Sequence, residues 1–158
     1  MKLQNNKGYV MTDASIAIII LLILVPTIMA LVYNVNATKR ATETKSEAIN
    51  IVTNAIEAAK GISLSELDDQ AILESIQDIY GEDKMTINEK TEDENTIYEG
   101  IIKTDKANYQ VSVTVVDYKD SVQNNEDIIP NIVKTVTATV KFRLSGTDKE
   151  ISLSTVVK

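Results

Sequence analysis

An uncharged stretch of 25 residues near the N-terminus restricts the possible folds of this chain more than any other feature. It runs from Ala14 to Thr38, and the part between Ile16 and Val32 is almost wholly apolar. An α-helix rises about 1.5 Å per residue, so this stretch can cross a hydrocarbon core about 30 Å thick. We therefore expect a membrane-spanning helix over residues 14–38.

Charge is distributed unevenly on the two sides of this stretch. Lys2 and Lys7 are the charged residues of positions 1–8, whereas residues 62–158 hold 19 acidic and 10 basic residues. Positively charged segments next to a membrane span tend to stay in the cytoplasm. The charge pattern predicts a single-pass membrane protein with a cytoplasmic N-terminus and an acidic extracellular C-terminal domain.

The composition excludes several classes of function. The chain contains no Cys, no His and no Trp, which removes disulfide frameworks, thiolate or imidazole nucleophiles and the usual zinc sites. A net charge of −7 argues against a surface that follows phosphates, so we expect no direct contact with nucleic acid. Acidic residues gather in segments 91–95 and 124–127 without the spacing of a calcium loop, and we interpret both segments as solvated loops. We expect no catalytic residues, no bound metal and no cofactor, and hence no enzyme.

The helical pattern continues beyond the apolar stretch. Residues 39–60 contain no Gly or Pro, and Gly61 then provides a suitable stop. Apolar residues recur there at the three- and four-residue spacing of one helical face, at Ala41, Ala48, Ile49, Val52, Ala55, Ile56 and Ala59. The sequence predicts one helix over residues 9–61, apolar all round in its first half and amphipathic in its second half.

Residues 62–158 carry the signals of a small α+β domain. Ser63 and Glu66 have the spacing of a capping box, which predicts a short helix from about Ser65 to Tyr80 that ends at Gly81. The apolar positions expected on its inner face are Leu67, Ala71, Ile72, Ile76 and Ile79.

Strands are expected in the rest of this domain. Apolar and polar residues alternate strictly over 109–115 and 136–144, and a hairpin turn at 145–148 leads into a strand over 151–156. A weaker strand is expected over 96–104, and residues 120–131 form a connecting loop. Alternation indicates an antiparallel sheet with one buried face. The predicted fold is therefore α+β, with a long N-terminal helix packed on a small antiparallel β-sheet.

The first residues carry a resemblance to a known family. Lys7-Gly8-Tyr9 precedes Asp13, and Asp13 directly precedes the apolar helix. This arrangement resembles the N-terminus of type IV pilin-like proteins, which comprise type IV pilins and type II secretion pseudopilins. The resemblance implies a pilin-like fold and a leader peptide over residues 1–8. It also implies that a prepilin peptidase cuts after Gly8 and methylates Tyr9 on the new N-terminal amine.

The same resemblance implies partners and a type of subunit. The partners are the prepilin peptidase, other pilin or pseudopilin subunits and the pilus assembly platform in the membrane. The family usually has Glu where this chain has Asp13, and its major pilins often carry a proline four residues beyond the position of Pro26. Both differences favour a minor pilin or a pseudopilin over the main subunit of a filament.

Asp13 and Pro26 also have physical roles that can be stated from their chemistry. A carboxylate near hydrocarbon costs about 2.5–3.5 kcal/mol on insertion scales, so Asp13 requires a cation such as the new amine of Tyr9, in its own chain or in a neighbour. Such a pair would set the axial register of assembling subunits. Alternatively, Asp13 lies at the headgroup boundary or caps the helix. Pro26 removes a backbone donor, which predicts either a kink or loosened point, or a proline that the membrane helix simply tolerates.

Two functions follow from these expectations. The first is a structural subunit, a minor one, of a type IV pilus or a type II secretion pseudopilus. The alternative is an extracellular binding domain that is anchored by a single span or secreted, without filament assembly. Residues 35–37, Val-Asn-Ala, provide a signal-peptidase site for the secreted form.

Overall fold

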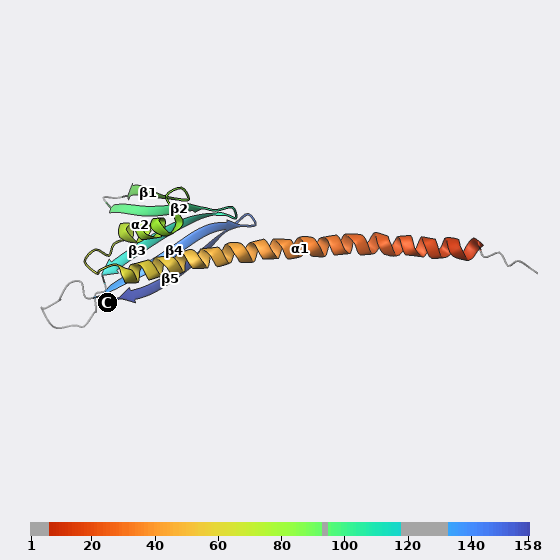
Figure 1. Cartoon of the computed structure of the whole chain (residues 1–158), viewed down its shortest axis with the longest axis horizontal. Coiled ribbons are helices and arrows are strands. Elements are labelled where there is room, and N and C mark those ends of the chain that lie inside the picture. The colour runs from red at the N-terminus through yellow and green to blue at the C-terminus, as the bar shows by residue number, and fades with distance from the viewer. Residues whose placement is uncertain (1–6, 93–94, 118–132) are drawn as a thin grey trace, which may run out of the picture. The chain divides into compact units, whose positions relative to one another are not determined.

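The computed structural model describes residues 7–92, 95–117 and 133–158 (Figure 1). Its elements, in chain order, are α1 (Lys7–Gly61), α2 (Asp69–Tyr80), β1 (Met85–Glu92), β2 (Asn95–Lys103), β3 (Asn108–Asp117), β4 (Lys134–Leu144) and β5 (Thr147–Val157). The chain divides into two compact units after Arg40, so α1 contributes to both. The predicted α+β class, with a long N-terminal apolar helix and an antiparallel sheet, is confirmed.

The sheet is an antiparallel meander with the strand order β1-β2-β3-β4-β5. The strands over 109–115 and 136–144 are confirmed as parts of β3 and β4, and the weaker strand over 96–104 corresponds to β2. The hairpin after β4 turns at Ser145 and Gly146, which both have positive φ (50° and 80°), as tight two-residue hairpins require. Because the turn is so short, β5 begins at Thr147, four residues before the predicted start.

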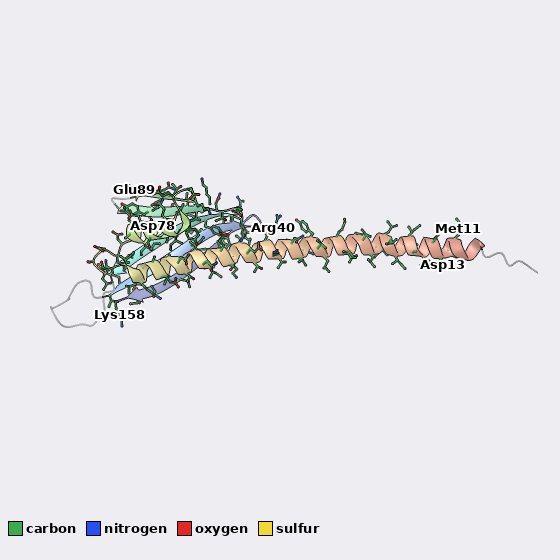
Figure 2. The ribbon with its side chains drawn as sticks, in the orientation of Figure 1. Met11, Asp13, Arg40, Asp78, Glu89 and Lys158 are labelled. Carbon is green, nitrogen blue, oxygen red and sulfur yellow. The ribbon has the colours of Figure 1, made fainter. Side chains whose placement is uncertain are left out.

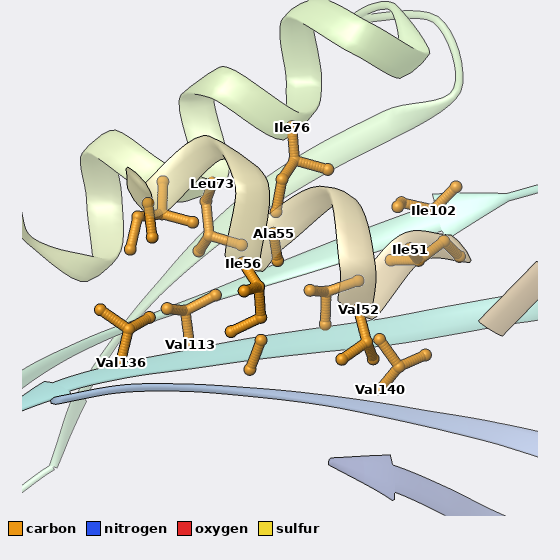
Figure 3. Close-up of a cluster of buried hydrophobic side chains, with 14 of the residues drawn as sticks. Ile51, Val52, Ala55, Ile56, Leu73, Ile76, Ile102, Val113, Val136 and Val140 are labelled. Carbon is orange, nitrogen blue, oxygen red and sulfur yellow. The ribbon is translucent and has the colours of Figure 1, made fainter. Parts of the chain in front are cut away.

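The amphipathic part of α1 provides the cover for the sheet. Its buried residues are Thr44, Ala48, Ile51, Val52, Ala55, Ile56 and Ala59. The apolar residues among them share one hydrophobic core with side chains of the strands, including Ile102, Val113, Val136 and Val140, as Figure 3 shows. Three of the helical residues are alanines, and such small side chains let the helix backbone approach the sheet closely. The predicted role of this stripe is confirmed.

One residue of the predicted stripe is wrong. Ile49 is 42% exposed, whereas Ile51, which the sequence analysis did not include, is completely buried. Successive residues of an α-helix are separated by about 100°, so Ile49 lies about 100° from Ala48 and Ile51 lies only about 60° from it on the other side. The stripe is therefore centred between Ala48 and Ile51.

The start of α2 also differs from the prediction. Asp68 is its N-cap, because the Asp68 carboxylate accepts a hydrogen bond from the backbone N–H of Ala71 at 2.7 Å. Ser63 and Glu66 instead close a preceding turn. The backbone N–H of Glu66 donates to Ser63 O at 3.0 Å, and Ser63 Oγ donates to Glu66 Oε2 at 2.9 Å. The helix thus begins at Asp69 rather than Ser65.

The end of α2 and most of its buried face agree with the sequence. Gly81 forms the C-cap with φ 89°, a conformation that favours glycine. The buried residues of α2 are Ile72, Leu73 and Ile76. Ile79 was expected on this face, but it is 58% exposed.

Strand β1 was missed by the sequence analysis. It pairs with β2 from Met85↔Ile102 onward, and it includes part of segment 91–95, which we expected to be a loop. Because β1 is an edge strand rich in charged residues, its alternation is weak, and pairing with β2 rather than burial defines it. Residues 93–94 and 118–132, which include the predicted loops at 120–131 and 124–127, lie outside the described residues.

Tyr109 links the sheet to α1. Its side chain is completely buried and packs against Phe142, with ring centroids 5.9 Å apart. The Tyr109 hydroxyl donates its hydrogen towards Thr44 O at 3.2 Å and Glu47 Oε2 at 3.1 Å. Burial, reinforced by the negative charge of Glu47, raises the pKa of Tyr109 well above its ordinary value.

A pair of substitutions tests the position of the buried stripe. We expect Ile51→Ala to lower the free energy of unfolding by about 2–5 kcal/mol, because it removes a fully buried side chain from a packed core. The matched control Ile49→Ala, on the same helix, should cost less than about 1 kcal/mol. Urea unfolding of the full chain in detergent, followed by circular dichroism, measures both values. Equal losses would contradict the observed phase of the stripe.

Tyr109→Phe tests the link between β3 and α1. The loss of the hydroxyl should cost about 1–2 kcal/mol at pH 7, because Glu47 and Thr44 O lose a donor. Since the pKa of Tyr109 is raised on folding, its stabilising contribution is complete below pH about 10 and is lost as the pH rises further, when the unfolded tyrosine ionises. Tyr109→Phe should therefore lose less stability than wild type between pH 9 and 11. Tyr33→Phe, at an exposed tyrosine, should retain the wild-type profile.

Candidate functional site: the exposed apolar segment of α1

The first part of α1 exposes its apolar side chains on every side. The large apolar residues from Met11 to Val35 are all exposed, from 47% at Val25 to 76% at Met11 (Figure 2). The helix is long and apolar enough to cross a membrane, with a mean hydropathy of 2.9 over an 18-residue window. A core helix of a soluble protein can have similar length and hydropathy, but it is buried, and this segment is not. A signal sequence near an N-terminus has the same length and hydropathy. Whether this segment is cleaved from the chain therefore distinguishes a signal sequence from a membrane-spanning helix.

Asp13 lies at the N-terminal edge of this segment. It is exposed and sits in the second turn of α1, one residue before the uncharged stretch begins. Among the residues that the structure describes, Asp13 has no ion-pair partner. Because α1 already begins at Lys7, Asp13 does not cap this helix. The carboxylate thus stands at the border of an apolar surface, and no described side chain forms an ion pair with it.

The predicted cleavage residues lie one turn before Asp13. The backbones of Gly8 and Tyr9 belong to the first turn of α1, and leader residues 1–6 are outside the described part of the chain. Side chains on a helix tilt towards its N-terminus, and residues four apart share one face about 6 Å apart along the axis. The Asp13 carboxylate is therefore directed towards the turn that contains the backbone nitrogen of Tyr9.

Pro26 does not interrupt α1. The helix is continuous from Lys7 to Gly61, although the ring of Pro26 provides no N–H for the carbonyl of Leu22. In the adjoining turn, Thr27 Oγ1 donates to Ile23 O at 2.7 Å, so a side chain satisfies one backbone acceptor beside the proline. The structure shows no break at Pro26, and unwinding there on leaving the membrane stays a prediction.

A second candidate is a hollow of about 710 Å³ on the sheet face opposite α1, with Glu99 inside it. Lys90 Nζ lies 2.6 Å from Glu99 Oε2, and Gln110 Nε2 donates to the same oxygen at 3.0 Å. The bond from Lys90 lowers the pKa of Glu99, which keeps this carboxylate ionised and unsuited to proton donation. The described residues include no group of three or more acidic, His or Cys side chains placed to hold a metal ion. This arrangement is that of a surface ion pair.

The sequence analysis did not single out the polar side chains on the same face of β3, β4 and β5. Thr135, Thr137 and Thr139 alternate with the buried residues Val136, Ala138 and Val140. The alternation was interpreted only as evidence for a strand. The polar positions of the same alternation, which form a regular row of hydroxyl groups on the outer face, were already visible in the sequence.

Comparison with known protein families, with characterised proteins and with solved structures finds no match for this chain.

Proposed function

We propose that this chain is a minor structural subunit of a type IV pilus or a type II secretion pseudopilus. In this proposal a prepilin peptidase cuts after Gly8, and the mature chain assembles through α1. The observation that supports it best is the division of α1 into two surfaces. Residues 14–38 expose apolar side chains all round, whereas the stripe from Thr44 to Ala59 is buried in the domain.

The exposed segment requires two successive environments in this proposal. Each large apolar side chain left in water would cost about 1.5–3 kcal/mol, so residues 14–38 first lie in the bilayer. Lipid tails and apolar side chains are equally apolar, so close packing rather than the hydrophobic effect drives helices together as they leave the lipid. The assembled filament then holds these segments in its centre. Local unwinding at Pro26 would ease the transfer, since one backbone hydrogen bond is already absent there.

Asp13 gives the assembly its register. Cleavage after Gly8 removes Lys2 and Lys7 and creates an α-amine on Tyr9, one turn from the Asp13 carboxylate. A subunit that enters out of register leaves this carboxylate unpaired among apolar helices, which is strongly unfavourable. A pair with the amine of its own chain would form in any register, so the register depends on a pair between the carboxylate and the amine of a neighbouring subunit.

The remaining features give the topology and the partners. The N-terminus faces the cytoplasm, where the prepilin peptidase acts, and residues 62–158 form the extracellular domain. Other pilin or pseudopilin subunits and the assembly platform of the membrane are the further partners. Nothing in this mechanism requires a catalytic residue, a metal or a cofactor in the chain.

The mass of the mature N-terminus tests this function against its alternatives. We expect the native protein to begin at a methylated Tyr9. A start at Thr38 would indicate a secreted domain, and an intact Met1 would indicate a simple membrane anchor. As a variant, Gly8→Leu should block processing, because the peptidase needs close access to the backbone there. Gly61→Leu, at a glycine with open space around it, is the matched control and should be processed normally.

Substitutions at Asp13 test the register. Asp13→Asn has almost the same shape but no charge, so we expect normal processing and at least about a tenfold loss of the chain from sheared filaments, equivalent to about 1.4 kcal/mol. Asp13→Glu keeps the charge and should assemble at near wild-type levels. Immunoblots of sheared filaments and of membranes measure the distribution. If Asp13→Asn is processed and assembles like wild type, the carboxylate has no role in register.

A further inference from the structure

The outer face of the sheet, opposite the face that α1 covers, contains a block of nine uncharged side chains. Strand pairing arranges them in three rows across β3, β4 and β5. We call this block the uncharged face, and it consists of Ser112, Thr114, Val116, Thr135, Thr137, Thr139, Ser152, Ser154 and Val156. None of these residues is buried, and Val116 and Val156 are among the most exposed apolar side chains of the domain.

The hydroxyl groups of the uncharged face are held in a fixed pattern. Thr137 Oγ1 and Ser154 Oγ are 2.9 Å apart, and Thr139 Oγ1 and Ser152 Oγ are 3.0 Å apart. Each pair uses one of its two hydroxyl hydrogens internally, which leaves the other free to be donated outward. Strands lie about 4.8 Å apart, and side chains on one face recur about every 6.8 Å along a strand. The face therefore presents a regular array of hydrogen-bonding groups and methyl groups.

The absence of charge on this face stands out against the rest of the chain. A quarter of all residues are charged, and the net charge is −7. Charged side chains begin in the next row of the same face, at Lys141 and Glu150, and on the neighbouring strand at Glu99. Two copies of such an acidic domain repel each other at long range. They can approach closely with least cost where neither surface carries a charge.

We propose that the uncharged face is a contact surface for the same face of a second copy of this chain. Threonine and valine are β-branched and pack well on a pleated surface, and the outward hydroxyls of one copy can bond to those of the other. A charged partner would find no opposite charge on this face. A second copy fits it, because like surfaces without charge are complementary to themselves.

Symmetry selects one arrangement of the two copies. A two-fold axis parallel to the strands brings the faces together and keeps residues 41–61 of both α1 helices pointing the same way. An axis across the strands would point them in opposite directions, and we propose the first axis for this contact. Sheets packed face to face lie about 10 Å apart, with their strands within about 30° of each other. With the axis over β4, which is the middle strand of the uncharged face, β4 of one copy lies over β4 of the other.

This contact goes beyond the proposed function and does not require it. Two membrane-anchored copies could form it before any filament exists. In a filament with α1 in the centre, the uncharged face points outward, so the same contact would join neighbouring filaments. Nine small side chains make a weak interface, but many copies along a filament would add their affinities.

Cysteine cross-linking of the full chain in detergent micelles tests the contact directly. The chain has no cysteine of its own, so a single introduced thiol reports one position. We expect Thr137→Cys, on β4 at the centre of the face, to give covalent dimers with a short bismaleimide. Thr86→Cys, on the same face of the sheet but on β1, is the matched control. In the proposed dimer its two thiols would be about 29 Å apart across six strand spacings, so it should not cross-link. Equal yields from the two variants would overturn the proposal.

Charge and salt provide an independent readout. Thr137→Lys places two like charges face to face and should reduce association at least about tenfold, whereas Thr86→Lys should leave it unchanged. Ser154→Lys, at a more exposed site of the face, should act like Thr137→Lys and provides a second variant should the first fail to fold. Association of wild type should rise between 0.05 and about 1 M NaCl, as the Debye length falls to about 3 Å and the repulsion is screened. Association that falls with salt would indicate a charge-paired interface and would overturn the proposal.

These outcomes are separable from those of the proposed function. A chain that keeps its first eight residues but still cross-links through Thr137→Cys would retain the contact without the pilin function. A chain that begins at Tyr9 but does not cross-link would retain the pilin function, and the contact alone would be wrong.

Discussion

Burial of one stripe of α1 against the sheet is the interaction on which the domain depends. Strands β3 and β4 are apolar on one face only, and this face would be open to water without a cover. The short helix α2 contributes only three buried side chains, whereas α1 contributes the seven residues from Thr44 to Ala59. Alanine at three of these positions reduces the distance between the helix and the sheet. The hydroxyl of Tyr109 then fixes the position of α1 relative to β3, because both acceptors of this hydroxyl lie on α1.

The first part of α1 is apolar on every side and the second part on one side only, and charged residues mark where each part begins and ends. Asp13 precedes the apolar segment, and Lys39 and Arg40 follow it directly before the amphipathic part. Between Asp13 and Lys39 the rotation of the helix about its own axis is unimportant, because apolar side chains lie on every side of it. Beyond Arg40 the phase matters, since only one side can face the sheet. This difference explains why hydropathy alone was enough to predict the first half, whereas the exact position of the buried stripe in the second half could not be predicted.

The errors of prediction have specific physical causes. The alternating strands β3 and β4 were predictable because an interior position and an exterior position differ at every step. Ile49 and Ile51 were not distinguishable, because both fit an apolar stripe and only the position of the sheet selects Ile51. Ser63 was a reasonable helix cap, but Asp68 competes with it and has the stronger local bond to the first turn. Strand β1 is defined by its pairing with β2, which no local pattern encodes.

The charge of the chain gives these surfaces their selectivity. In a chain of net charge −7, two copies that meet at random bring like charges together, and the encounter is unfavourable. Among the described residues, the apolar segment at residues 14–38 and the uncharged face are free of this penalty. One requires lipid or another apolar helix, and the other presents hydroxyl groups that water also satisfies. We therefore expect the proposed contact through the apolar segment to be stronger than the proposed contact through the uncharged face. If both contacts form, the acidic surface restricts how copies of the chain meet without any charge-paired contact between them.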